Sequence, residues 1–295
     1  MTKHITFWDE TPLLIAVGTG RSNRFVEKLV KRIVAVGAKD KLFVTNSASS
    51  NPLHYAATVG NATGARLLVE QAPEMTHIRN VEGNTPLKLA ARHGNKETLK
   101  YLLTVTREEE GSSHYTGVDG GDLITLTIMN GYYVPSIKNI HDIKVNNHIS
   151  SLLVDRICKA VIEQVDHNIA WNILGSAIAT AVTYGIHELI EKCILTYPGI
   201  IWYNVGGFYL FLAVIKQRQE RVYNLVYQMS RFKVYSAVQQ DNEKKENALH
   251  IAAKLAPPHR LNVVTGAALQ IQRELQWFQE VEKFVKPSFK EALNI

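Results

Sequence analysis

Three short stretches of this chain share one pattern: TPLLIAVGTG from Thr11, NPLHYAATVGN from Asn51 and TPLKLAARHGN from Thr85. Their prolines stand at positions 12, 52 and 86, so the motif recurs after 40 and then 34 residues. A second stretch with apolar residues at three- and four-residue spacing follows each copy, which predicts a second helix. Recurrence at this period predicts a stack of helix–turn–helix units, each burying its apolar face against its neighbours.

The positions of the motif have local physical reasons. The leading threonine or asparagine can cap the first helix, and the proline occupies the first helical position, where its missing N–H costs nothing. We expect Gly18, Gly60 and Gly94 to end the first helices in the left-handed conformation. His54 is expected to hold neighbouring turns together by hydrogen bonds. Lys88 replaces this histidine in the third copy, so we expect that bond to be lost or changed there.

The C-terminal half repeats the theme more loosely, with small residues at Ala181, Ala213 and Ala252, and with His250 in the histidine position. A long helix is predicted after Thr265. We expect one apolar face of this helix to cover the open end of the stack. The residues predicted for that face are Ile271, Leu275, Phe278, Val281 and Val285.

The uncharged segment from Thr196 to Ile215 is long enough for a membrane-spanning helix. However, Pro198, Asn204 and Gly206-Gly207 divide it, and paired glycines are a turn signal. The repeat register predicts instead the end of one second helix, a loop and the next first helix.

The motif resembles the T-P-L-H-x-A signature of ankyrin repeats, whose period is about 33 residues. Three further stretches resemble plant ankyrin-repeat proteins that end in a membrane-embedded PGG domain. They are IKNIHDIK leading into LLVDRICKAV, then QRQERVYNLVYQM, and above all NALHIAAKLAPPHRLNVVTGAALQIQRELQWFQEVEKFVKPSFKEALN. This chain departs from that family in lacking its next repeat, with a G-x-T-P motif, and its hydrophobic PGG region. Its spacer, Gly111 to Pro135, is also shorter.

Together the repeats and the resemblance predict an all-α ankyrin-repeat solenoid of stacked helix–turn–helix units with a long C-terminal helix. We expect N-terminal ankyrin repeats at 1–105, a linker with a degenerate or deleted repeat at 106–135, and a helical spacer at 136–168. Divergent repeats and the long helix are expected at 169–295.

The resemblance implies a non-catalytic scaffold for protein–protein interaction, in plant stress or defence signalling. The alternative that it leaves open is a membrane-associated regulatory protein or a truncated fragment of a multi-pass membrane protein. In either case, the resemblance implies that full-length ankyrin-repeat membrane relatives are candidate partners of this chain.

Composition excludes several other classes. The chain is 46% hydrophobic and 20% charged, as a folded protein should be. Its net charge of +6 comes from scattered Lys and Arg, so no clustered basic face predicts nucleic-acid binding. Cys158 and Cys193 form no CxxC pair and are expected to be free core thiols, which points to the cytoplasm. The resemblance extends this expectation to the inner face of the plasma membrane.

No pattern predicts catalytic, cofactor-binding or metal-binding residues, or a small-molecule substrate. The stretch GTGRSNR, Gly18 to Arg24, meets neither of the glycine-rich phosphate-loop patterns. His141, His148 and His167 have no Cys or carboxylate at metal-ligand spacing.

A protein-binding surface therefore remains as the predicted functional site. Repeat stacks of this kind are curved and bind partners on the concave face. By register, that face uses the turn tips and the outer side of the first helices. The predicted partner-binding residues are Ser47, Ala48, Ser50, Thr58 and Val59 in the second repeat, and Val81, Glu82, Asn84, Arg92 and His93 in the third.

Overall fold

The computed structural model describes residues 5–107, 114–115, 117–132, 140–162, 167–205, 207–228, 240 and 245–290. Within the helices, the side chains at 117–118, 140–148, 161–162, 167–169, 172 and 288–289 are outside this description. The chain divides into two compact units, residues 1–157 and 158–295. The predicted division into four parts stays a prediction, and residues 108–113, 116, 133–139 and 163–166 of its linker and spacer lie outside the described residues.

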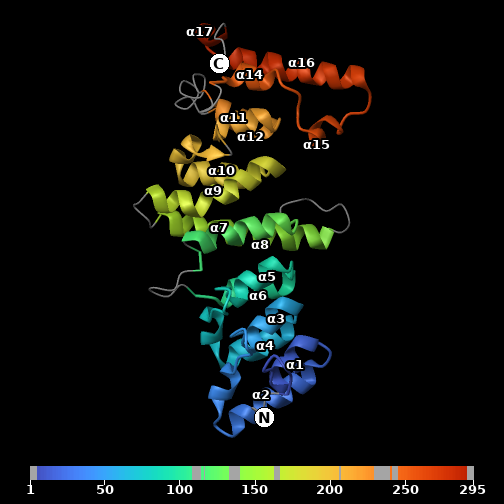
Figure 1. Ribbon diagram of the computed structural model, residues 1–295, viewed down its shortest axis with the longest axis vertical. Coiled ribbons are helices and arrows are strands. Elements are labelled where there is room, and N and C mark those ends of the chain that lie inside the picture. The colour runs from blue at the N-terminus through green and yellow to red at the C-terminus, as the bar shows by residue number, and fades with distance from the viewer. Residues whose placement is uncertain are drawn as a thin grey trace. The chain divides into compact units, whose positions relative to one another are not determined.

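The first unit consists of helix pairs stacked side by side (Figure 1). First helices contact the first helices of the next pair, and second helices do the same, which gives two layers. The helices are α1 (Pro12–Thr19), α2 (Asn23–Ala35), α3 (Pro52–Val59), α4 (Ala62–Gln71), α5 (Pro86–Arg92), α6 (Lys96–Val105), α7 (Gly117–Met129) and α8 (Ile140–Ile162), with the short 3-10 helices η1 (Lys39–Phe43) and η2 (Pro73–His77).

The first helices begin as the motif predicts. The side chains of Thr11, Asn51 and Thr85 each accept a hydrogen bond from a backbone N–H in the first turn, and proline follows in each case. Local chemistry therefore fixes where each repeat starts.

One predicted helix end is wrong. Gly60 and Gly94 are left-handed, with φ of 78° and 68°, but in the first repeat this role belongs to Gly20, with φ of 59°. Gly18 lies inside α1. A Cβ at Gly18 would meet Cδ1 of Tyr55 at 2.7 Å, so glycine is needed there for the approach of a neighbouring ring.

A series of side-chain amides joins successive repeats. Asn61 donates to the carbonyl of Val17 at 3.2 Å, and Asn95 donates to the carbonyl of Ala57 at 2.7 Å. Asn130, after α7, donates to the carbonyl of Ala91 at 3.0 Å. Each amide thus satisfies a carbonyl at the end of the preceding first helix, where intrahelical donors run out. The segment containing α7 is stacked in the same way as the clear repeats.

His54 links two repeats, as expected. Its Nδ1 accepts a hydrogen bond from the Asn51 backbone N–H, so its Nε2–H donates to the Asn84 carbonyl at 3.1 Å. His250 makes the same capping bond with the backbone N–H of Asn247. The expected change at Lys88 is also observed, because its ammonium reaches Asp119 at 3.1 Å and Asp122 at 2.7 Å on α7.

Acidification is expected to weaken the first unit through His54. Burial lowers the pKa of His54 to about 4, whereas an unfolded histidine titrates near 6.5. The unfolded chain therefore binds more protons between these values, so stability is full at neutral pH and falls as the pH drops below about 6.5. The loss attributable to His54 between pH 7 and pH 5 is about 2 kcal/mol. Urea unfolding at the two pH values measures it.

The variant His54→Gln should be less stable than the parent at pH 7 but should lose less on acidification. His93→Gln is the matched control, since His93 is exposed and takes no part in these bonds. Equal pH slopes for His54→Gln and the parent would contradict this account.

The second unit continues the helix pairs with α9 (His167–Tyr184) and α10 (His187–Thr196), then α11 (Leu210–Lys216) and α12 (Glu220–Gln228). The last turns of α8, from Cys158, also belong to it. Its remaining elements are η3 (Pro198–Trp202), the antiparallel strands β1 (Asn204–Val205) and β2 (Phe208–Tyr209), α14 (Ala248–Ala252), α15 (Pro258–Leu261), α16 (Ala267–Phe284) and α17 (Pro287–Lys290).

The predicted reading of the uncharged segment is confirmed. Thr196 ends α10, and η3 and the β1–β2 hairpin lead into α11. Among the residues that the structure describes, no helix has both the length and the apolar character needed to cross a bilayer.

The long C-terminal helix is present as α16, but its predicted packing face is only partly right. Val281 and Val285 are buried, Phe278 is half-buried, and Ile271 and Leu275 are exposed. Trp277 and Phe284 take their place against the rings of Tyr223 and Phe211. The cause is the rotation of α16 about its axis, which is set by this aromatic cluster and is not encoded in the apolar spacing alone.

Candidate functional site: the turn-tip face of the first unit

The turns before the first helices are tied to one another by their backbones. The backbone N–H of Ser47 donates to the Trp8 carbonyl at 3.1 Å, and that of Val81 donates to the Ala48 carbonyl at 3.0 Å. Each turn is also closed internally, for example by the Asn80 N–H donating to the Asn84 carbonyl at 3.1 Å. These bonds hold three successive turns in a fixed row. We call the surface they form with the first helices the turn-tip face; its residues are Phe7, Trp8, Ser47, Ala48, Thr58, Val59, Val81, Glu82, Arg92 and His93.

Large apolar side chains stand at the tips of this row. Phe7 is 90% exposed, Trp8 62% and Val81 71%. The rings of Phe7 and Trp8 contact each other edge to face, with centroids 5.5 Å apart. Exposed apolar side chains that gather on one rigid surface are typical of interaction sites.

Most of the predicted contact residues lie at the surface. Ser50 is half-buried, whereas Asn84 is only 1% exposed. The exposed residues are Ser47, Ala48, Thr58, Val59, Val81, Glu82, Arg92 and His93. Their contribution to binding stays a prediction, and in this structure the Asn84 side chain supports its neighbours instead of facing a partner.

Asn84 positions the charged pair of the third repeat. Its Nδ2 donates to Glu82 at 2.7 Å, and its Oδ1 accepts from Arg92 Nη2 at 3.2 Å. Arg92 Nη1 also reaches Glu82 at 3.3 Å. The pair is exposed, so it contributes little stability and is available to reorient toward a partner.

A pocket of about 560 Å³ opens on this face between α1 and α3. The ring of Tyr55 lines it and packs against Gly18, which has no side chain to block the ring. The Tyr55 hydroxyl donates to Glu10 at 2.6 Å and accepts from the Asn46 amide at 3.0 Å. Burial, followed by the bond to Glu10, raises the pKa of Tyr55 to about 12, so the phenol stays protonated. The pocket thus combines a mostly apolar lining with one carboxylate.

Phe7, Trp8 and the residues of the pocket, apart from Ser50, Thr58 and Val59, are not among the predicted contact residues. The repeat register contained the signal, because Phe7 stands four residues before Thr11, as Ser47 and Val81 stand four residues before Asn51 and Thr85. The tip of the first repeat carries the largest apolar side chains of the row.

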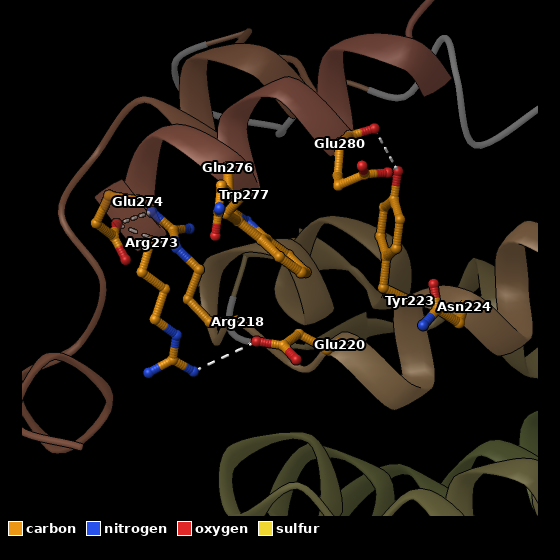
Figure 2. Close-up of a pocket in the computed structure, with 9 residues that line it drawn as sticks. All are labelled: Arg218, Glu220, Tyr223, Asn224, Arg273, Glu274, Gln276, Trp277 and Glu280. Atoms are coloured by element: carbon orange, nitrogen blue, oxygen red, sulfur yellow. Dashed lines mark hydrogen bonds and ion pairs between the residues drawn. The ribbon is translucent and has the colours of Figure 1, made fainter. Parts of the chain in front are cut away.

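A second pocket, of about 320 Å³, lies between α12 and α16 in the second unit (Figure 2). Arg218 is buried there and binds Glu274 at 2.7 Å, with its guanidinium 5.8 Å from the Trp277 ring centre. Arg273 and Glu220 form a more exposed pair at 3.3 Å (Figure 2). The charged side chains that line this pocket pair with one another. These ion pairs hold α16 in place.

The structure gives no basis for a metal centre in the part of the chain it describes. Within the described ranges, no three His, Cys, Asp or Glu side chains come close enough together to hold an ion.

Comparison with known proteins identifies the repeats. A family profile described as "Ankyrin repeats (3 copies)" matches residues 13–110. Ankyrin repeat and SAM domain-containing protein 6 of Rattus norvegicus is 36% identical over 89 residues, covering 30% of this chain and 8% of that protein. The transient receptor potential cation channel subfamily A member 1 homolog of Caenorhabditis elegans is 38% identical over 74 residues, covering 25% and 6%. The chain thus spans less than a tenth of either relative.

Solved structures extend the likeness to the fold of most of the chain. The ankyrin repeat domain of Bcl-3, described as a member of the IkappaB protein family, superposes with a TM-score of 0.54. It covers 85% of this chain and 96% of that domain at 18% identity. The protein therefore contains ankyrin repeats at residues 13–110 and has an all-α ankyrin-repeat fold.

Proposed function

We propose that this chain is a non-catalytic scaffold that binds a protein partner through the turn-tip face of its first unit. The observation that carries the proposal is the row of exposed apolar side chains, Phe7, Trp8 and Val81, on turns that backbone hydrogen bonds hold together. Tryptophan and other large side chains dominate binding energy at protein interfaces. A rigid display lowers the entropy lost on binding.

The apolar pocket between α1 and α3 supports the same face. It lies beside Thr58 and Val59, and its carboxylate, Glu10, is held by Tyr55 and Thr6. A partner side chain that enters this pocket would meet apolar walls and one fixed negative charge. The concave face that ankyrin stacks use for binding includes turn tips and first helices of this kind.

One observation supports a pathway for this chain, namely the resemblance of its C-terminal half to a plant family. A role in plant stress or defence signalling, and association with membrane-embedded ankyrin relatives, rest on the resemblance of the C-terminal half to plant PGG-domain proteins. The rat and nematode relatives add no support to either.

Changing Trp8 to serine is expected to weaken partner binding by at least about 30-fold, the effect of losing a hot-spot side chain worth roughly 2 kcal/mol. The measurement is affinity capture from a cell lysate on the immobilised chain, with bound proteins quantified by mass spectrometry. Any protein retained through this face should be depleted on the variant.

Phe25→Ser is the matched control, because Phe25 is an exposed aromatic side chain of the same unit but lies on α2. Thermal unfolding of both variants should match the parent. Equal capture by the parent and Trp8→Ser, or equal losses with Phe25→Ser, would contradict binding at the turn-tip face.

A further inference from the structure

The carboxylate in the pocket between α1 and α3 has neutral partners only. Glu10 lines this pocket and is half-buried. Its Oε1 accepts a hydrogen bond from the Tyr55 hydroxyl at 2.6 Å, and its Oε2 accepts one from the Thr6 hydroxyl at 2.9 Å. Within the described part of the chain, no ion pair includes Glu10. A carboxylate has about four acceptor positions, so about half of those on Glu10 are left for a ligand.

The walls of the pocket suit the stem of a long basic side chain. Ile15 and Val59 supply aliphatic surface beside the ring of Tyr55. Arginine and lysine bury their methylene stems against such surface while the charged head reaches a polar group. The planar guanidinium of arginine also stacks on aromatic rings, which an ammonium group does less well.

The second unit already contains an arginine held in this way. The guanidinium of Arg218 binds the carboxylate of Glu274 at 2.7 Å and lies 5.8 Å from the centre of the Trp277 ring (Figure 2). In the pocket of the first unit, Glu10 and Tyr55 supply the same two groups, a carboxylate and an aromatic ring. The arginine is the component that this pocket lacks among the described residues.

We propose that the pocket between α1 and α3 binds an arginine side chain of the protein partner, with the guanidinium on Glu10 and the stem along Tyr55. This inference rests on the proposed function, because it assigns the chemistry of one contact at the turn-tip face. Charge complementarity selects the occupant, since an acidic side chain would be repelled by Glu10 and an apolar one would desolvate the carboxylate without pairing it. The forked guanidinium can donate to both carboxylate oxygens.

The test uses the full chain and three small compounds, the N-acetyl N-methylamides of arginine, citrulline and lysine. Each is titrated at millimolar concentration into the ¹⁵N-labelled protein. The arginine compound should produce saturable shifts of the backbone amides of Ile15, Tyr55 and Val59. The citrulline compound has nearly the same shape but no charge, so it should bind at least about tenfold more weakly. The lysine compound should also bind more weakly than the arginine compound. Equal binding of arginine to either of the others would overturn the proposal, and this comparison needs no variant.

Two variants locate the site. Glu10→Gln keeps an oxygen that accepts from Tyr55 but removes the charge, so the affinity for the arginine compound should fall at least about tenfold. Glu82→Gln is the matched control, because Glu82 is an exposed carboxylate of the turn-tip face that already pairs with Arg92. Its affinity should equal that of the parent. An unchanged affinity in Glu10→Gln, or an equal loss in Glu82→Gln, would show that the compound binds elsewhere.

This result is separate from the test of Trp8. If the arginine compound fails to bind while Trp8→Ser still depletes a captured protein, the assignment of the pocket is wrong and the proposed function stands. If the compound binds through Glu10 while Trp8→Ser captures the same proteins as the parent, the pocket is supported and only the role of the turn tips is contradicted.

Discussion

Replacement of Trp277 by alanine is expected to lower the free energy of unfolding of the second unit by about 3–5 kcal/mol, the cost of truncating a large buried aromatic side chain. Trp277 is 7% exposed and packs against the Tyr223 ring at 5.3 Å, next to the Phe211–Phe284 pair. These rings join α16 to the α11–α12 pair. Urea unfolding followed by far-ultraviolet circular dichroism measures the loss without relying on tryptophan fluorescence.

Leu275 provides the matched control on the same helix. It is 55% exposed, so Leu275→Ala should change the free energy of unfolding by no more than about 0.5 kcal/mol. If the two substitutions cost the same, the orientation of α16 described above is wrong. In that case the face through Ile271 and Leu275, which the apolar spacing favoured, would be the packed one.

Replacement of Arg218 by alanine is expected to cost about 3–5 kcal/mol, because it removes one partner of a buried charge pair. Arg218 binds Glu274 at 2.7 Å (Figure 2). It also donates to the carbonyls of Ala252 at 3.1 Å and Lys254 at 2.5 Å. The truncation would therefore leave a carboxylate and two helix-end carbonyls without these donors. Hydrogen exchange in α14 and α16 should show where stability is lost.

Two further variants test the reason for this loss. Arg273→Ala removes the more exposed pair with Glu220 in the same pocket and should cost no more than about 1 kcal/mol. Arg218 also has a left-handed φ of 54°. Arg218→Gly should therefore be more stable than Arg218→Ala by about 1 kcal/mol, since glycine adopts this conformation without strain. Equal stabilities of the glycine and alanine variants would show that the backbone there is unstrained.

The backbone at Arg218 shows how a divergent repeat keeps its stacking. Gly60-Asn61 and Gly94-Asn95 supply a left-handed residue followed by an amide that reaches the preceding repeat. Arg218-Gln219 occupies the same place, and Gln219 donates to the Val182 carbonyl at 2.7 Å. A different pair of residues forms the same geometry in this repeat. The repeat is therefore recognisable in the sequence only by its spacing.

Elements built from neighbouring residues could be predicted from the sequence. Side chains within a few positions of each other determine the helix starts at Thr11, Asn51 and Thr85 and the capping role of His54. They also determine the break that follows Thr196. The helix pairs and the all-α ankyrin-repeat fold follow in turn, since the repeat period records where each pair begins.

Two predictions were wrong because they depend on how a helix is rotated about its axis and on which residues lie next to it in space. The motif places Gly18 at a helix end, but the ring of Tyr55, which lies in the motif's next copy, explains why glycine stands there. Apolar spacing predicts a face of α16 through Ile271 and Leu275, but the aromatic cluster buries the face through Trp277 and Val281 instead.

The sequence by itself thus determined that the chain forms stacked helix pairs, where each pair starts, and that its Lys and Arg are scattered. Helix capping, the position of proline and the period of apolar residues all act over one or two helical turns. They can therefore be recognised in the sequence alone. Tertiary packing alone decided which distant residues meet: Gly18 with the ring of Tyr55, Lys88 with the carboxylates of α7, and Trp277 with the ring of Tyr223. Those meetings depend on how each helix is rotated against its neighbour, which is set by close packing of many side chains at once.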